Sequence, residues 1–397
     1  MISRPTFLRT LSSPLLLPSP GNLSSLACEQ LHGCDCRATG EDQLRAMRLF
    51  IAAAAAAATA MAACSAPTGP PATNPLQRQL EAATSGTGSL AHLRKLQRIA
   101  DQNGGNRASP GPGYDASVDY VVGVLRRAGW PVSTPEFDLD GDRIRNVIAE
   151  TKTGDSDHVV MAGAHLDSVE DGPGMNDNGS GSAALLEIAV RMGGSPEVSN
   201  QVRLAWWGAE EVDMDGSTHY IETLSRADRG NIALYLNLDM VASPNVAYLV
   251  EGKGGCEEDA PDGSTEVARV LAERLAGTGV TPEIIEFMCD SDYMPFMDAG
   301  IATAGAFTGD DEEKTRRQAR RWGGQAGEDF DPCYHESCDG LDNVNVKALD
   351  HYTDAVGGPS ATLHYRSRAF RPGDQLRSAA ESIVHVASRA ILMIIAR

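Results

Sequence analysis

Side chains that can bind a metal ion or move a proton follow three short apolar runs, each typical of a buried strand. They are His165 and Asp167 after residues 159–162, Glu210 and Glu211 after residues 202–207, and Asp239 after residues 234–238. Two further stretches carry similar groups, namely residues 174–182 with Asp177 and residues 333–339 with Tyr334 and His335. Because sites in open α/β sheets form beyond the carboxyl ends of strands, we expect these groups to meet at one edge of a sheet.

Imidazole and carboxylate groups without thiolates suit Zn, Mn or Co. Taken singly, each of these residues is more often a cap, turn or solvated group. Their gathering beside Trp206 and Trp207 favours a metal, because unpaired carboxylates are costly in apolar surroundings. Several ligands fit two metals that share one carboxylate, roughly 3.5–4 Å apart, better than one tetrahedral zinc. The side chains of Glu210 and Glu211 point apart, so one can bind metal while the other handles a proton.

The elements that must position these groups alternate between helical and extended patterns. Helical spacing is evident through Leu93, Leu96 and Ile99, and again from Val118 to Leu125. We predict strands at residues 147–149, 159–162, 202–207, 233–238, 247–250, 283–287 and 301–307, and helices at residues 182–192 and 264–275. This alternation predicts a single globular α/β domain at residues 89–360, with a mostly parallel, mixed central sheet flanked by helices on both faces.

The composition of the chain indicates a folded protein and excludes some classes of function. The chain has 397 residues, 42% of them apolar and 22% charged, so it can bury a core. A formal charge of −20 argues against nucleic-acid binding, which requires clustered Lys and Arg. The acidic balance suits a cation site or a positively charged substrate, although solubility alone also explains it.

The two ends of the chain differ from the centre. Residues 1–46 show no periodicity, and we interpret them as an untranslated or disordered extension. Residues 47–64 have a charged start, an apolar run and small residues before Cys64, a pattern typical of a bacterial signal peptide. Lipidation of Cys64 would tether the protein to a membrane, and plain secretion is the alternative. Residues 65–88 resemble a flexible linker, whereas residues 361–397 form a tail that no pattern assigns to the domain.

The exported part of the chain contains four cysteines, Cys256, Cys289, Cys333 and Cys338. Their spacing is not that of a zinc ribbon, and in an oxidising compartment an even number permits two bridges. The simplest arrangement joins Cys333 to Cys338 and Cys256 to Cys289.

Six stretches together resemble the M28 family of metallopeptidases, in particular its secreted, Streptomyces-type leucine aminopeptidases. The stretches are residues 163–168, 176–181, 206–211, 236–240, 307–309 and 333–339, and the resemblance extends from about Leu90 to about Asp354. It implies two co-catalytic zinc ions with Asp177 as the bridging carboxylate. His165 and Asp239 resemble ligands of one ion and Glu211 and His335 ligands of the other, in this or the alternative pairing.

The resemblance also implies roles for the neighbouring residues. Glu210 is similar to the general base, Asp167 to the carboxylate that orients His165, and Tyr334 to the tyrosine that stabilises the oxyanion. A cis peptide bond often follows the bridging aspartate of such enzymes, here at Asp177-Asn178.

Two features depart from the family pattern. An Arg usually begins the motif that here starts at Asp290, so Asp290 removes a cation from the substrate side of the site. Asp350 and Asp354 resemble a calcium-binding pair, which implies a Ca²⁺ site, although the matching N-terminal Asp is not evident.

The sequence therefore predicts a monomeric, secreted or lipid-anchored zinc aminopeptidase that acts on peptides with a free N-terminus and a large apolar first residue such as Leu. One alternative is a glutaminyl cyclase-like enzyme of the same fold with a single zinc, which the full set of ligands disfavours. Another is a peptidase-like binding ectodomain without catalysis, which would be expected to lack ligands.

Overall fold

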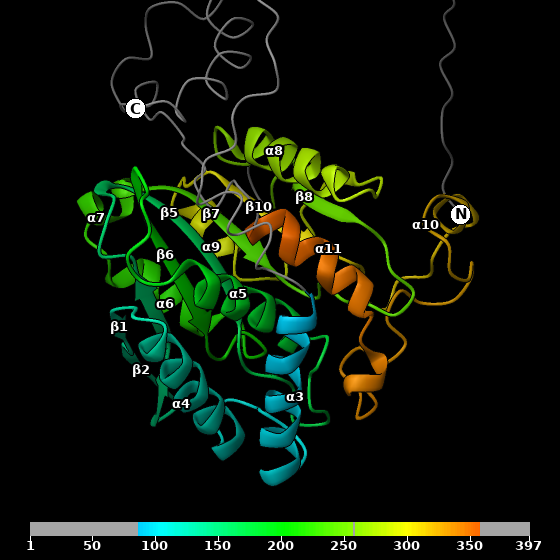
Figure 1. Cartoon of the computed structure of the whole chain (residues 1–397), viewed down its shortest axis with the longest axis horizontal. Coiled ribbons are helices and arrows are strands. Elements are labelled where there is room, and N and C mark those ends of the chain that lie inside the picture. The colour runs from blue at the N-terminus through cyan, green and yellow to red at the C-terminus, as the bar shows by residue number, and fades with distance from the viewer. Residues whose placement is uncertain (1–85, 257–258, 358–397) are drawn as a thin grey trace, which may run out of the picture. The chain divides into compact units, whose positions relative to one another are not determined.

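The apolar runs of the sequence form strands of one eight-stranded sheet in the computed structural model, which describes residues 86–256 and 259–357. The sheet has the order β1-β4-β6-β5-β7-β10-β8-β9 (Figure 1). Its strands are β1 (Val132–Ser133), β4 (Val147–Glu150), β5 (Asp155–His165), β6 (Asn200–Trp207), β7 (Ile232–Leu238), β8 (Leu249–Lys253), β9 (Glu283–Glu286) and β10 (Thr303–Phe307). Strands β6, β5, β7 and β10 are parallel neighbours, and β4 and β8 run antiparallel on either side. The predicted mixed sheet with a parallel centre is confirmed.

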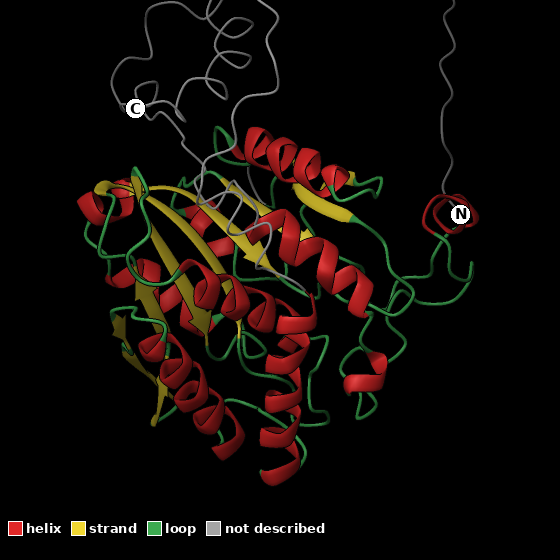
Figure 2. Cartoon of the chain, viewed as in Figure 1, coloured by secondary structure: helices red, strands yellow, loops and turns green. Residues whose placement is uncertain are grey.

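Helices cover both faces of the sheet (Figure 2). They are α3 (Gly86–Gln102), α4 (Pro112–Arg127), α5 (Gly179–Met192), α6 (Asp215–Thr223), α7 (Arg226–Asn231), α8 (Ser264–Gly277), α9 (Met294–Asp298), α10 (Arg316–Trp322) and α11 (Val346–Gly357). Helices α4, α5 and α8 pack on one face, with α3 and α11 against α5, while α6, α7 and α9 lie on the other. Two layers of helices therefore bury the apolar strands between them.

Adjacent tryptophans at the end of β6 illustrate how both faces are filled. Successive side chains of a strand point to opposite faces, so Trp206 and Trp207 enter different layers. The indole nitrogen of Trp206 donates to the carbonyl of Ser182 on α5, at 3.1 Å. That of Trp207 donates to the hydroxyl of Tyr235, at 2.9 Å. Each large side chain is thereby fixed by packing and by one hydrogen bond.

A short hairpin outside the main sheet was not expected from the sequence. Strands β2 (Glu136–Leu139) and β3 (Asp142–Arg145) pair antiparallel and enclose the turn Asp140-Gly141. Both turn residues have positive φ, 52° and 98°, as a tight hairpin with an Asp-Gly turn requires. The Asp-Gly signal was present in the sequence, but only two side chains of the hairpin are buried, so its apolar pattern is weak.

The boundaries of the domain differ slightly from the expectation. Helix α3 begins at Gly86, so residues 86–88, assigned above to the linker, belong to this helix. The predicted extension 1–46, the signal peptide 47–64 with Cys64, the rest of the linker and the tail 361–397 lie outside the described residues. Across the described ranges, no helix combines the length and apolarity needed to cross a bilayer.

Two disulfide bonds are present in the described part of the chain. Cys256 pairs with Cys289, and Cys333 pairs with Cys338, as the cysteine count suggested. The second bond closes a short loop that contains Tyr334 and His335.

The start of helix α5 is packed closely against the end of strand β7. Asn178 caps the helix, because its side-chain oxygen accepts a hydrogen bond from the backbone nitrogen of Gly181 at 2.9 Å. A Cβ atom at Gly181 would lie 2.3 Å from the carbonyl oxygen of Leu238. Glycine is thus required where the helix and the strand meet.

Replacing Gly181 with Ala should lower the free energy of unfolding by about 1–3 kcal/mol, because the neighbouring backbone must move. The matched control is Gly123→Ala in α4, where a Cβ would meet only the end of the Arg127 side chain at 3.4 Å. This substitution should stabilise the protein by about 0.5–1 kcal/mol, since Ala is the better helix former. Urea unfolding measures both, and equal effects would contradict the packing argument.

Candidate functional site

The predicted site residues meet at the carboxyl edge of the central strands. His165 is the last residue of β5, Glu210 and Glu211 follow β6, and Asp239 follows β7. Since β6, β5 and β7 are adjacent in the sheet, their ends place these side chains together. The loop before α5 adds Asp177, and the disulfide-closed loop adds His335.

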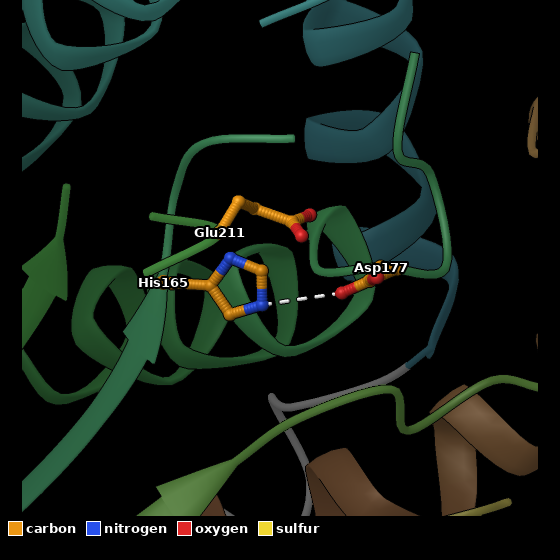
Figure 3. Close-up of side chains that lie close together, drawn as sticks. All are labelled: His165, Asp177 and Glu211. Carbon is orange, nitrogen blue, oxygen red and sulfur yellow. Dashed lines mark ion pairs between the residues drawn. The ribbon is translucent and has the colours of Figure 1, made fainter. Parts of the chain in front are cut away.

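Asp177 lies between two imidazole rings. Its Oδ1 is 3.2 Å from Nε2 of His165, and its Oδ2 is 3.1 Å from Nε2 of His335. Asp239 Oδ1 lies 3.2 Å from the same nitrogen of His165, and Glu211 Oε2 lies 3.1 Å from that of His335. Figure 3 shows His165, Asp177 and Glu211 converging, with the ion pair between His165 and Asp177 marked. The carboxylate of Asp177 therefore lies between two pairs of potential ligands, His165 with Asp239 and His335 with Glu211.

These side chains fit divalent cations. Two groups, His165 with Asp177 and Glu211, and His165 with Glu210 and Asp239, each bring their ligand atoms within 4.8 Å of one another. Glu211 Oε1 is buried without a hydrogen-bond partner, which leaves it free to bind an ion. Within the described ranges, no Lys or Arg forms an ion pair with these carboxylates. A set of nitrogen and oxygen donors suits zinc.

Without a metal ion, burial and the neighbouring charges shift the pKa values of these side chains strongly. Burial raises the pKa of Glu210 well above its ordinary value, and burial together with Asp177 raises the pKa of Glu211 to about 7. Burial opposes protonation of His335, but Asp177 and Glu211 outweigh it and raise its pKa to about 10. Metal ligands must be deprotonated, so a divalent ion would displace protons from this cluster.

The loop that carries Asp177 is held by backbone hydrogen bonds. The amide nitrogens of Asn176 and Asp177 donate to Asp339 Oδ2, at 3.1 and 3.0 Å. The buried guanidinium of Arg107 donates to the carbonyls of Pro173 and Gly174 in the same loop, at 3.0 and 2.5 Å. The cis peptide bond implied by the resemblance is present at Asp177-Asn178. The sequence placed Asp339 near the site but did not indicate that it fixes this loop.

Asp167 and Tyr334 lie beside the imidazoles, as expected. Asp167 is fully buried, and its Oδ1 is 3.6 Å from Nδ1 of His165, longer than a hydrogen bond. The same oxygen accepts a hydrogen bond from the backbone nitrogen of Glu210, at 3.4 Å. The ring of Tyr334 stacks on that of His335 with 3.9 Å between centroids, and Tyr334 lines the cavity over the cluster.

Two residues that contact the site through Asp239 were missed. The hydroxyl of Ser291 donates to Asp239 Oδ2 at 2.5 Å, and the side-chain amide of Asn237 donates to Ser291 Oγ at 2.8 Å. Both lie in stretches that the sequence analysis selected because of other residues. Asn237 lies two residues before Asp239, and Ser291 directly follows Asp290, but nothing in the sequence indicated that they contact Asp239.

Backbone strain is concentrated beside the cluster. Ala209, Met240 and His335 have φ values of 56°, 45° and 58°, in the left-handed region that residues other than glycine rarely adopt. Each is a site residue or is adjacent to one. Such positions cost free energy and are found where a site requires a fixed geometry.

The predicted calcium pair lies elsewhere. Asp350 and Asp354 are four residues apart on α11. The groups of three or more metal-competent side chains found among the described residues do not include them, and the calcium site stays a prediction.

Comparison with known proteins agrees with the geometry. Residues 146–358, more than half of the chain, match the model of peptidase family M28. The chain belongs to this family. It is 45% identical to leupeptin-inactivating enzyme 1 of Streptomyces exfoliatus, with 69% of this chain and 60% of that protein covered. It is 34% identical to the probable lipoprotein aminopeptidase LpqL of Mycobacterium tuberculosis, with 68% and 85% covered.

The fold is also that of a solved aminopeptidase structure. The LapA aminopeptidase of Legionella pneumophila superposes with a TM-score of 0.57 at 16% identity, over 72% of this chain and 74% of that one. At this identity the likeness shows the shared fold alone.

Removing metal with a chelator should lower the melting temperature by on the order of 10 °C. The reason is that a metal ion present at about a thousand times its Kd adds about 4 kcal/mol to the free energy of unfolding. Thermal unfolding after adding Zn²⁺ back should recover the loss. Mg²⁺ is the control and should not recover it, since it prefers oxygen ligands in octahedral geometry. An unchanged melting temperature after chelation would argue against a bound metal.

Proposed function

We propose that this protein is a dizinc aminopeptidase that removes the first residue from peptides with a free N-terminus. The observation that carries the proposal is Asp177, whose two oxygens face different histidines at 3.2 and 3.1 Å. A shared carboxylate is the arrangement that two-metal hydrolases use. Membership of family M28 supports the same activity.

The distances favour one assignment of ligands. His165 and Asp239 would hold one zinc ion, His335 and Glu211 would hold the other, and Asp177 would bind both. Asp167 would hold the ring of His165 in the orientation that presents Nε2 to the metal. When bound, zinc supplies Lewis acidity and lowers the pKa of water.

The remaining chemistry is that of the protein side chains. Glu210 would take the proton of the attacking water and return it to the leaving amine. Burial raises the pKa of this carboxyl group, which suits a group that accepts and then releases a proton. The hydroxyl of Tyr334, in the wall of the cavity, would donate to the developing oxyanion.

The cavity over the cluster has a volume of about 370 Å³, within the range of small-molecule sites. Met240, Met288 and Phe307 provide apolar walls, consistent with the large apolar first residue that the resemblance implies and equally with the aliphatic stem of a longer side chain. We further propose that the protein is monomeric and extracellular, either secreted or tethered through Cys64. The name of the mycobacterial relative, a probable lipoprotein, supports the tether.

Glu210→Gln should leave zinc content and melting temperature near those of the wild type and lower kcat by about 10²–10⁴-fold, because only proton transfer is lost. The neighbouring Glu211→Gln is the comparison, and it should lose zinc. Metal analysis and hydrolysis of Leu p-nitroanilide measure both effects. Near-normal turnover by the Glu210 variant would remove it from the mechanism.

Purified protein should contain two zinc ions per chain, and His335→Ala should retain fewer than two, because one ligand group loses its imidazole. Metal analysis and hydrolysis of a panel of aminoacyl anilides test this. One zinc per chain, with cyclisation of N-terminal glutamine, would instead support the glutaminyl cyclase alternative. A protein that retains no zinc and hydrolyses no anilide would support a binding ectodomain.

A further inference from the structure

The carboxylates around the cavity carry more negative charge than the proposed pair of zinc ions would offset. Eight carboxylate side chains line the cavity, and no Lys or Arg among the described residues does. Two divalent ions offset only four negative charges. Four of the eight, Asp213, Glu251, Asp290 and Asp310, belong to neither group of metal-competent side chains. Clefts lined by one sign of charge attract ligands of the opposite sign.

Glu251 is a buried carboxylate without a cationic partner among the described residues. It lies on β8, is 3% exposed and forms no ion pair within the described ranges, yet it is part of the cavity wall. Its partner across the strands is Gly305, and a Cβ atom there would lie 2.1 Å from Glu251 Oε2. The missing side chain at Gly305 therefore makes room for the carboxylate. Burying a charge is costly unless it is paired.

One tyrosine links Glu251 to a second cavity carboxylate. The hydroxyl of Tyr293 lies 2.9 Å from Glu251 Oε1 and 3.3 Å from Asp290 Oδ1. It also accepts a hydrogen bond from the backbone nitrogen of Cys289, at 2.7 Å. A phenol has a single proton, so it can fully satisfy only one of the two carboxylates. The other hydrogen bond to Glu251, from the backbone nitrogen of Met288 at 3.0 Å, also reaches Oε1.

We propose that Glu251 and Asp290 bind the positive end of the substrate's first side chain, so that the protein prefers peptides beginning with Lys or Arg over neutral analogues of equal length. This inference rests on the proposed aminopeptidase function. The aliphatic stem of such a side chain would pack against Met288 and Phe307, and its ammonium or guanidinium group would form charge-assisted hydrogen bonds with the pair. A cation there also stabilises the ionised form of Glu251, which burial disfavours.

The experiment compares kcat/KM for the p-nitroanilides of lysine and norleucine, which differ only in the terminal ammonium group. Wild-type protein should hydrolyse the lysine substrate faster. Glu251→Gln should lower the lysine-to-norleucine ratio about tenfold or more, since the amide has the same shape without the charge. Asp290→Asn, on an exposed residue, should lower the ratio in the same direction and serves if the Glu251 variant does not fold.

The matched control is Glu222→Gln on α6, an exposed residue that does not line the cavity, and it should leave the ratio within about threefold of wild type. A ratio that falls less than threefold in both Glu251→Gln and Asp290→Asn overturns the specificity inference while leaving the aminopeptidase function intact. A zinc-loaded protein that hydrolyses no anilide overturns the proposed function, and this inference with it. Arginine and citrulline anilides provide an independent pair with the same expected order.

Discussion

The concentration of carboxylates around two imidazoles is the constraint on which this structure depends. Asp177, Glu210, Glu211 and Asp239 are wholly or largely withdrawn from water, and no Lys or Arg pairs with them in the described ranges. Such a cluster is stable only when protons or metal ions offset its charge. The raised pKa values of Glu210 and Glu211 express this cost in the protein alone, and a divalent ion would remove it.

The scaffold is arranged so that this cluster cannot relax apart. Parallel strands place His165 and Asp239 side by side, and the glycine at 181 lets helix α5 approach the end of β7. Hydrogen bonds from Arg107 and to Asp339 fix the loop that carries Asp177 from two directions. Fixed geometry of this kind is what preorganised catalysis requires, because little rearrangement is then needed during the reaction.

Part of the negative charge of the chain is concentrated in the carboxylates of the cavity. A formal charge of −20 is compatible with solubility alone, and much of it lies on exposed residues. Glu251 is different, because it is buried, faces the cavity and shares Tyr293 with Asp290. A positively charged substrate was one of the explanations that composition left open, and these contacts give it a specific location.

Motifs at strand ends were sufficient to predict the α/β fold and which side chains would gather at the candidate site, because local sequence determines which residues follow each buried strand. The periodicity of β5, β6 and β7 was equally clear, since strands buried on both faces have continuous apolar runs. The hairpin β2–β3 was not predicted, because few of its residues are buried. The contacts of Ser291, Asp339 and Glu251 were not predicted for another reason. Each forms a hydrogen bond with a residue at least 37 positions away in the chain, and such contacts exist only once the strands and loops are packed together.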